Sequence, residues 1–242
     1  MTIYITELEK DNYHFPSSEH ALSDPNGLLA FGGGLEPERI LLAYGQGIFP
    51  WYGPGEPVLW WSPCPRAMFN PKVFQPAKSL KKYQKKHQYT VSINQATEQV
   101  IQLCASLRPA EETWLNEDMQ RAYINLASKG HCHSVEVWHK DQLVGGLYGI
   151  LRGKVFCGES MFSTATNASK VALWYFCQHF AQHGGEWIDC QVMNPHLASL
   201  GAIERLRTDF LSDLLSLKKE DVDAHCFLPQ LITHTPTISD LK

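Results

Sequence analysis

The sequence lacks long apolar runs, paired-cysteine motifs and an excess of basic charge. No stretch approaches the about 18 uncharged apolar residues that a membrane helix needs, so a membrane-spanning protein is not expected. Lys and Arg number 21 against 25 Asp and Glu, a formal net charge of -4, which argues against a protein that coats nucleic acid through its whole surface. Only 19% of the 242 residues are charged and 44% are hydrophobic, so the chain can bury a sizeable core and is neither disordered nor fibrous.

The cysteines and the first residues favour a cytoplasmic protein. The seven cysteines form an odd set without a C-x-x-C pair, which suits buried, reduced thiols. Residues 1–10 contain two glutamates and lack the basic start and apolar run of a signal peptide. The tripeptide His131-Cys132-His133 would place neighbouring side chains on opposite faces of a strand, so no metal site is expected.

Turn-forming residues are concentrated near the N-terminus. Residues 15–69 are rich in Gly, Pro and Trp, which interrupt long elements. We therefore predict a small irregular N-terminal α+β domain over residues 1–62, with one helix at about 36–46, and a second domain over residues 63–232. The last residues, from about Pro229, show little pattern, and residues 233–242 are predicted to be a loose tail.

Hydrophobic spacing predicts mixed secondary structure in the second domain. Helices or helical turns are expected at 76–87, 94–107, 116–128, 168–183 and 195–200. Strands at 134–139, 143–151 and 154–158 would form an antiparallel meander, followed by a strand at 186–192. Meander, helix, strand and helix in this order predict an α+β fold.

A stripe of lysines lies on one face of the predicted helix at 76–87. Its members share the spacing i, i+3/i+4, i+7/i+8 with no acid among them: Lys78, Lys81, Lys82, Lys85 and Lys86. A cationic stripe on an otherwise acidic chain suits phosphates. The residues alone leave open a merely solvated face, and do not say whether the polyanion is RNA, DNA or lipid.

Two segments carry acids among apolar neighbours. In the predicted strand at 186–192, alternation puts Asp189 and Gln191 on one face and apolar residues on the other. The two either form a hydrogen-bonded unit that orients a nucleophile or are simply exposed. Glu159 follows a glycine at the end of an apolar strand, so it is exposed, paired or placed to act on a substrate. Ser160 lacks a G-x-S-x-G elbow.

The tryptophans at 51, 60, 61 and 114 lie outside periodic core patterns. Aromatic rings near a cationic face can stack on unpaired bases. In small Gly/Pro-rich domains tryptophan is also a common core filler, and the residues alone favour that interpretation.

Ten segments in series resemble one known family. They read FGGGL (31–35), GIFPW (47–51), WSPCPR (61–66), TW (113–114), HSVEVW (133–138), GGLYG (145–149), FCGESMFS (156–163), NASK (167–170), DCQ (189–191) and HLASLGA (196–202). In this order, over about residues 15 to 215, they closely resemble the bacterial leucyl/phenylalanyl-tRNA-protein transferases. No single segment is specific, but the series is.

The resemblance implies a fold and a reaction. A small N-terminal domain would precede a domain similar to the Gcn5-related N-acyltransferase fold. The reaction would move leucine or phenylalanine, and also methionine, from charged tRNA to the α-amino group of a protein beginning with Arg or Lys, which marks that protein for degradation. The ester bond of the donor supplies the driving force, so no cofactor is expected. A monomer is expected.

The resemblance also implies site residues. Asp189 and Gln191 match a catalytic pair in which Asp189 orients Gln191 and both align the attacking amine with the ester carbonyl. Residues matching the pocket for the donor side chain are Leu147, Phe156, Leu173, Phe176, Phe180 and Ile188, with Glu159 at the edge. Trp51 and Trp114 match residues that hold the 3′-terminal adenosine. The lysine stripe becomes a platform for acceptor-stem phosphates.

One departure and two rival interpretations accompany the resemblance. Arg205-Leu206-Arg207 stands where the family commonly reads Ile-Pro-Arg. An acyl-CoA-dependent N-acetyltransferase would need a Gly-rich turn at a helix N-terminus, but residues 159–168 contain no glycine. A non-catalytic protein that binds or sequesters tRNA would also explain the lysine stripe and the tryptophans.

Overall fold

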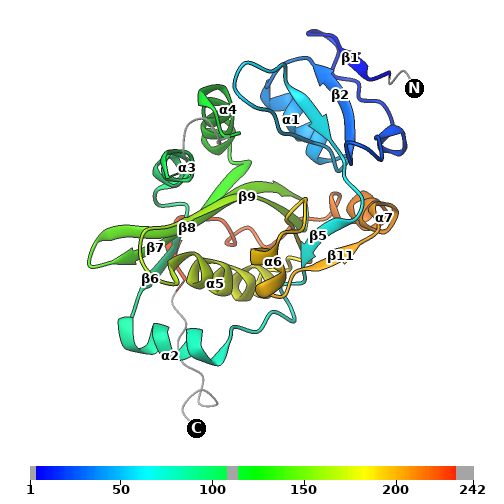
Figure 1. The fold of residues 1–242 in the computed structure, drawn as a ribbon. Helices are drawn as coiled ribbons and strands as arrows, with labels where there is room; N and C mark the ends of the chain where they lie inside the picture. Colours follow the sequence, from blue (N-terminus) through cyan, green and yellow to red (C-terminus); the bar gives the residue numbers. More distant parts are fainter. Residues whose placement is uncertain (1–3, 108–113, 233–242) are drawn as a thin grey trace.

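The chain builds two β-sheets, a small one from its N-terminal part and a large one from the rest (Figure 1). The structure is a computed structural model that describes residues 4–107 and 114–232. Helices and mixed sheets alternate along the chain, and the α+β class is confirmed. Among the described residues, no helix is both long and apolar enough to cross a lipid bilayer.

The N-terminal part is more regular than its composition suggests. Its four-stranded sheet has the order β1-β2-β4-β3, built from β1 (Thr6–Leu8), β2 (Leu28–Gly32), β3 (Phe49–Pro50) and β4 (Leu59–Trp61). A short 3-10 helix, η1 (Ser18–His20), and the predicted helix α1 (Pro37–Tyr44) complete it. Strands this short leave little periodicity to detect, which is why the sequence indicated an irregular domain.

The large sheet has the order β11-β5-β10-β9-β8-β7-β6-β12. Its strands are β5 (Arg66–Phe69), β6 (Thr90–Ile93), β7 (Cys132–His139), β8 (Gln142–Arg152), β9 (Val155–Ser163), β10 (Trp187–Asp189), β11 (Ile203–Arg205) and β12 (Gln230–Leu231). The predicted antiparallel meander is β7-β8-β9, and β10 returns parallel to β9 after a helix. This is the element order that the sequence predicts.

Helices cover both faces of the large sheet (Figure 1). They are α2 (Lys78–His87), α3 (Thr97–Ser106), α4 (Glu117–Ser128), α5 (Ala168–Gln182), α6 (Pro195–Ser199) and α7 (Arg207–Leu217). Helices α3 and α4 lie over the face that also receives the N-terminal part, and α5 with α2 lies over the other. Helix α4 begins where the Asn116 side chain accepts a hydrogen bond from the Met119 N–H at 3.0 Å.

Strand alternation divides the interior into two cores. On β8, Tyr148 and Ile150 enter the core beneath α3 and α4, whereas Leu147 enters the core beneath α5. On β9, Cys157 enters the core beneath α3 and α4, and Phe156 enters the core beneath α5. Gly145 lets α5 approach β8 closely, because a Cβ there would lie 2.5 Å from the Ala168 Cβ. The core on the α5 side of the sheet therefore contains Leu147 and Phe156.

Several predicted boundaries were wrong. Strand β9 continues to Ser163, past the expected end at Gly158, because it stays paired with β8. Strand β10 stops at Asp189, since Gln191 has a left-handed φ of 57°, and the expected alternation fails at Val192, which is 50% exposed. The sequence showed little pattern beyond Pro229, but the chain forms a strand there, β12, which pairs with β6. The tail predicted at 233–242 lies outside the described residues.

The predicted boundary at 62/63 falls between the last strand of the small sheet, β4, and the first of the large sheet, β5. One hydrophobic cluster nevertheless joins the two parts, since Trp60 and Met68 belong to it together with residues of α3 and α4. Trp60 is fully buried and donates its indole N–H to the Gly32 carbonyl at 3.0 Å, so it is a core filler. The extents 1–62 and 63–232 remain a prediction.

Candidate active site

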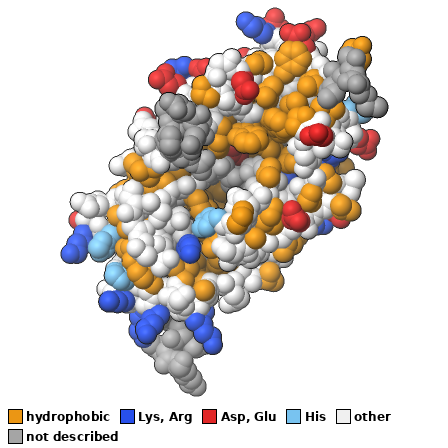
Figure 2. Space-filling view, viewed as in Figure 1, with side chains coloured by type: hydrophobic (Ala, Val, Ile, Leu, Met, Phe, Trp, Pro, Cys, Tyr) orange, Lys and Arg blue, Asp and Glu red, His pale blue; other side chains and the backbone are white. Residues whose placement is uncertain are grey.

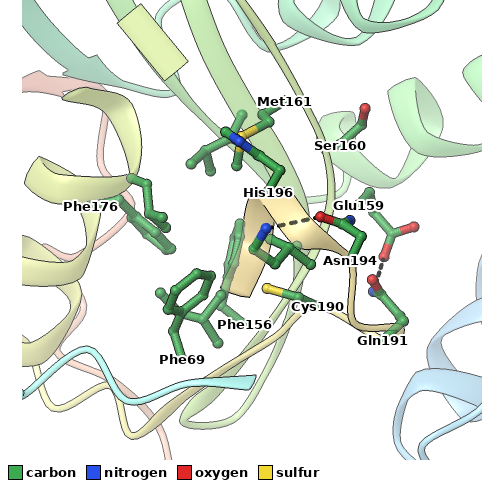
Figure 3. A pocket seen from close by; sticks show the side chains of 15 residues that line it. Phe69, Phe156, Glu159, Ser160, Met161, Phe176, Cys190, Gln191, Asn194 and His196 are labelled. Atoms are coloured by element: carbon green, nitrogen blue, oxygen red, sulfur yellow. Dashed lines mark hydrogen bonds between the residues drawn. The ribbon is translucent and has the colours of Figure 1, made fainter. Parts of the chain in front are cut away.

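An apolar cavity of about 200 Å³ opens between β9, β10, α5 and α6 (Figure 3). Six of the seven predicted pocket residues line it: Leu147, Phe156, Glu159, Leu173, Phe176 and Ile188. The seventh, Phe180, is not among the lining residues; it stacks behind Phe176 with ring centroids 5.2 Å apart. Lining residues that the sequence did not predict include Phe69, Met161, Cys190, Asn194, His196 and Leu197. The volume suits one side chain and is below the roughly 300 Å³ at which pockets for drug-sized ligands begin.

Aromatic packing gives the cavity a firm wall. Phe156 of β9 meets Phe176 of α5 edge-on, with ring centroids 4.5 Å apart. Leu173 lies one helical turn before Phe176, on the same side of α5. Helix α6 closes another side, and its start is fixed by Asn194, whose side chain accepts from the Leu197 N–H at 2.9 Å. The cavity is therefore bounded by packed aromatic rings on one side and by a capped helix on another.

Asp189 is completely buried at the end of β10 and is held by Arg66 of β5. The guanidinium donates to both carboxylate oxygens, Nε to Oδ1 and Nη2 to Oδ2, each at 2.7 Å. Burial lowers the pKa of Arg66, but the Asp189 carboxylate more than offsets this, and the net pKa is raised. Sequence reasoning assigned no role to Arg66, although a carboxylate buried on a strand requires such a partner.

Asp189 touches the backbone of Gln191, not its side-chain amide. The Gln191 N–H donates to Asp189 Oδ1 at 3.0 Å. This bond holds the residue in its left-handed turn, which aims the side chain along the cavity mouth (Figure 3). The Gln191 Nε2 instead donates to Glu159 Oε1 at 3.3 Å. Asp189 and Gln191 therefore lie together as the sequence suggested, with Glu159 as the third member of the group.

Glu159 is half-buried on β9 and is surrounded by neutral hydrogen-bond donors. The Tyr123 hydroxyl of α4 donates to its Oε2 at 2.7 Å, and the Tyr44 and Tyr123 hydroxyl oxygens lie 3.0 Å apart. Burial raises the pKa of Glu159 to about 7; hydrogen bonds from Tyr123 and Tyr44 lower it, and the Asp189 charge raises it. A carboxyl group with this pKa can exchange a proton near neutral pH.

The lysines of the stripe are exposed on α2, and Lys and Arg side chains gather at the lower end of the molecule, where α2 lies (Figure 2). Lys78, Lys81, Lys82, Lys85 and Lys86 are all exposed, and among the described residues none of them forms an ion pair. The buried residues of the helix are Leu80 and Gln84. The five charges therefore face solvent together and are available to a polyanion.

The two tryptophans matched to the adenosine site lie outside the cavity lining. Trp51 is 46% exposed and meets Trp61 edge-on at 5.7 Å, while Trp61 donates its indole N–H to the Trp51 carbonyl at 2.6 Å. Trp114 is half-buried and packs against the core beneath α3 and α4. The preceding Thr113 of the TW segment lies outside the described residues.

Fold and site together define a class of protein: an α+β protein with an apolar cavity whose mouth carries the Gln191 amide and the Glu159 carboxyl group. The chain belongs to the leucyl/phenylalanyl-tRNA protein transferase family. The model of that family matches residues 68–215, and the model of its N-terminal domain matches residues 33–64.

Similar proteins agree with this assignment. The chain is 68% identical to the leucyl/phenylalanyl-tRNA–protein transferase of Vibrio atlanticus, covering 98% of this chain and 100% of that protein. It is 56% identical to the protein of the same name from Photobacterium profundum, covering 96% and 98%. The solved structure of L-PGS from Bacillus licheniformis aligns at 11% identity and a TM-score of 0.39, covering 81% of this chain and 74% of that chain. That structural likeness is too distant to carry an inference about activity.

Proposed function

We propose that this protein transfers leucine or phenylalanine from aminoacyl-tRNA to the α-amino group of proteins that begin with Arg or Lys. The observation that carries the proposal is the apolar cavity of about 200 Å³ whose mouth presents Gln191 and Glu159. One apolar side chain fills such a cavity while its ester lies at the polar mouth. An unbranched methionine suits the same wall, whereas a β-branched side chain fits poorly. The acceptor becomes a degradation substrate in the cytoplasm, and the enzyme acts as a monomer.

The reaction exchanges an ester for an amide. The acceptor's neutral α-amine attacks the carbonyl carbon, the new C–N bond forms, and the bond from that carbon to the terminal ribose oxygen breaks. The amine loses one proton and the leaving ribose hydroxyl gains one, so no cofactor is required. Holding the two reactants in contact supplies much of the acceleration.

The residues at the mouth divide this work. Gln191 Nε2 is engaged with Glu159, so its Oε1 remains to accept an N–H of the attacking amine. Glu159, with its pKa raised to about 7 by burial, takes the proton that the amine releases. Asp189 does not touch the amine; it is a positioning residue that fixes the Gln191 turn through the backbone N–H. Arg66 supports it in turn.

The tRNA has two proposed contacts outside the cavity. The exposed lysines of α2 would neutralise acceptor-stem phosphates. Trp51, nearly half exposed, and Trp114 would hold the terminal adenosine by stacking.

The contact with the lysines of α2 is tested by the salt dependence of tRNA binding. One variant carries Ala in place of Lys81, Lys82, Lys85 and Lys86, and the control carries Ala in place of the exposed Lys129 and Lys140. A flatter slope in the α2 variant alone supports the platform; equal slopes contradict it.

The experiment that tests the function supplies tRNA charged with radiolabelled leucine and two peptides that differ only in beginning with Arg or with Gly. Label on the Arg peptide alone supports donor, acceptor and reaction together. Label on neither peptide, with tRNA binding intact, would favour a protein that sequesters tRNA.

A variant separates catalysis from binding. Gln191→Ala should bind charged tRNA as the wild type does, because it leaves the aromatic residues of the cavity in place, yet transfer poorly. Gln178→Ala on α5, a glutamine that does not line the cavity, serves as the matched control. Parallel loss of binding and transfer in Gln191→Ala would contradict the assigned role.

A further inference from the structure

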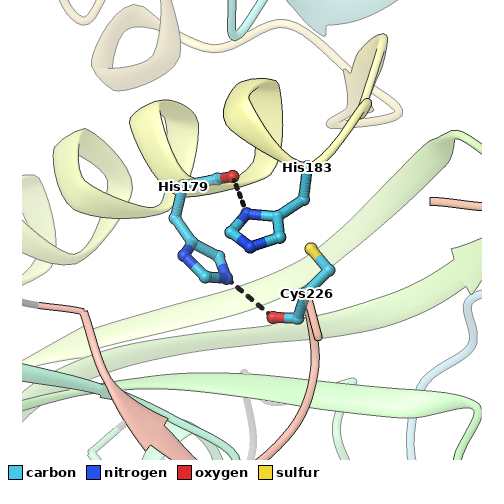
Figure 4. A group of neighbouring side chains, drawn as sticks. All are labelled: His179, His183 and Cys226. Carbon is cyan, nitrogen blue, oxygen red and sulfur yellow. Dashed lines mark hydrogen bonds between the residues drawn. The ribbon is translucent and has the colours of Figure 1, made fainter. Parts of the chain in front are cut away.

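Two histidines and a cysteine meet at the C-terminal end of α5 (Figure 4). His179 and His183 are four residues apart at the end of α5, so their rings lie on the same side of the helix, with centroids 4.1 Å apart. Cys226 comes from the segment that follows α7 and is fully buried. One donor atom from each of the three lies within 4.8 Å of the other two. No element of the transfer reaction uses this group.

Backbone carbonyls already orient both rings. His183 Nδ1 donates to the His179 carbonyl at 2.8 Å, which leaves Nε2 with its lone pair. His179 Nε2 faces Cys226 and lies 2.7 Å from the Cys226 carbonyl oxygen (Figure 4). Histidines that bind metals characteristically have the second ring nitrogen hydrogen-bonded to a carbonyl or carboxylate, and His183 already has this arrangement.

We propose that His179, His183 and Cys226 form a site for a zinc ion, with water in the fourth position. Two imidazole nitrogens and one thiolate are the donor set that Zn²⁺ prefers. Bond lengths near 2.1 Å to nitrogen and 2.3 Å to sulfur place tetrahedral ligand atoms about 3.3 to 3.6 Å apart. The three donor atoms lie within 4.8 Å of one another, so they must approach one another by up to about 1 Å when the ion binds. Half-buried His183 leaves room for the water.

Binding exchanges protons for the metal. When the ion binds at His179 Nε2, the bond from this nitrogen to the Cys226 carbonyl breaks and the ring proton moves to Nδ1, which leaves the imidazole neutral. The Cys226 thiol releases its proton to solvent as the zinc–sulfur bond forms. No electron is transferred. The bond between His179 Nε2 and the Cys226 carbonyl must therefore open for the ion to bind at that nitrogen, whereas His183 keeps its bond to the His179 carbonyl.

The position of the site indicates what the ion does. Residue 223 is joined to α5, because its N–H donates to the His183 carbonyl at 2.9 Å. The next aromatic along the segment, Phe227, stacks on His133 at 4.0 Å and on Phe156 at 6.1 Å. A zinc ion would fasten this segment to α5 and so support the rear wall of the cavity. The proposal does not depend on the transfer reaction.

The test titrates untagged, chelator-treated protein with Zn²⁺ and, separately, with Co²⁺. We expect one equivalent of Zn²⁺ to bind and to raise the melting temperature, and Co²⁺ to give a thiolate charge-transfer band with the d–d bands of tetrahedral cobalt. Cys226→Ser and His183→Gln should each weaken binding by more than about 100-fold, above the 10- to 100-fold cost of losing an outer partner. His183 is half-buried, so its variant is expected to fold.

The control is Cys64→Ser, which changes a half-buried thiol outside the cluster and should keep the full affinity. Absence of the charge-transfer band would overturn the site, as would equal affinity in wild type, Cys226→Ser and His183→Gln. Either result would make the group a hydrogen-bonded part of the core.

Discussion

The two carboxylates near the cavity mouth occupy opposite electrostatic environments. Asp189 is wholly buried and faces a guanidinium that donates two hydrogen bonds of 2.7 Å. Glu159 is half-buried and has a phenol and an amide as neighbours, with no cation paired to it in the described part of the chain. The paired carboxylate is suited to hold the geometry of a turn. The unpaired one, with its pKa raised to about 7, is suited to exchange a proton.

The largest expected effect comes from breaking the buried pair. Arg66→Met leaves the Asp189 charge buried without a partner, and we expect the free energy of unfolding to fall by about 3 to 5 kcal/mol. Adding Asp189→Asn removes the second charge, so the double variant should regain a large part of the lost free energy of unfolding. Urea denaturation measures the free energy of unfolding of both variants.

An exposed ion pair provides the control for that experiment. Arg121 and Asp118 are more than half exposed, and Arg121→Met should change the free energy of unfolding by no more than about 1 kcal/mol. Two results would contradict this interpretation of Asp189 as a buried charge that depends on Arg66. In one, Arg66→Met lowers the free energy of unfolding by no more than Arg121→Met does. In the other, the double variant is as unstable as Arg66→Met alone.

The second effect concerns the other carboxylate. Glu159→Gln keeps the shape and the hydrogen-bonding reach of the side chain but cannot accept the proton, and we expect single-turnover transfer to fall by about 100-fold or more. In the wild type the rate should rise with pH through about 7 as Glu159 ionises. The variant should lose that step and keep only the step caused by the acceptor amine. An unchanged step near 7 would remove Glu159 from proton transfer.

The same variant has a signature in stability. Because burial raises the folded-state pKa of Glu159 from 4.5 to about 7, the folded state binds more protons than the unfolded state between these values. The wild-type free energy of unfolding should therefore decrease as pH rises from about 4.5 to 7, since ionised Glu159 is disfavoured in the fold. Glu159→Gln should show a smaller decrease over that range. This measurement is independent of any substrate.

The sequence predicted local structure well and partners across the fold poorly. The periodicity of 168–183 indicated α5, and the alternation of 134–151 indicated β7 and β8, because each pattern is repeated within one element. Arg66 and Asp189 are 123 residues apart, and no local pattern connects them. Gln191 adopts a left-handed turn without being a glycine, so neither composition nor spacing revealed where β10 stops.

The family resemblance supplied what periodicity could not, within limits. It assigned Glu159 and five other residues of the cavity lining, which are within or near recognisable segments. It did not supply the phenols that contact Glu159, since Tyr44 lies on α1 and Tyr123 on α4. These contacts arise from the packing of the N-terminal part on the large sheet, which only the three-dimensional fold specifies.

The third effect adjusts the proton-exchanging carboxylate without removing it. Tyr123→Phe deletes the hydroxyl that donates to Glu159 at 2.7 Å, a bond that lowers the pKa of Glu159. Losing one such bond should raise that pKa by about one unit. The pH step should move upward by the same amount, and the transfer rate at pH 7 should fall about fivefold. A rate that falls equally at all pH values would indicate a structural defect instead.

The smallest effect comes from the outer phenol, Tyr44. Its hydroxyl lies 3.0 Å from that of Tyr123 and also lowers the pKa of Glu159, by less than Tyr123 does. Tyr44→Phe should therefore shift the pH step in the same direction by less than about half a pH unit, and the transfer rate at pH 7 should fall less than about threefold.

The matched control is Tyr148→Phe, because the Tyr148 hydroxyl is buried without a hydrogen bond among the described residues. This variant should leave the pH step in place. Equal shifts for Tyr44 and Tyr148 would mean that bulk desolvation alone sets the pKa of Glu159. A shift confined to Tyr44 would mean that α1 helps to set the protonation of a residue on the large sheet. The N-terminal part of the chain would then have a role in the chemistry.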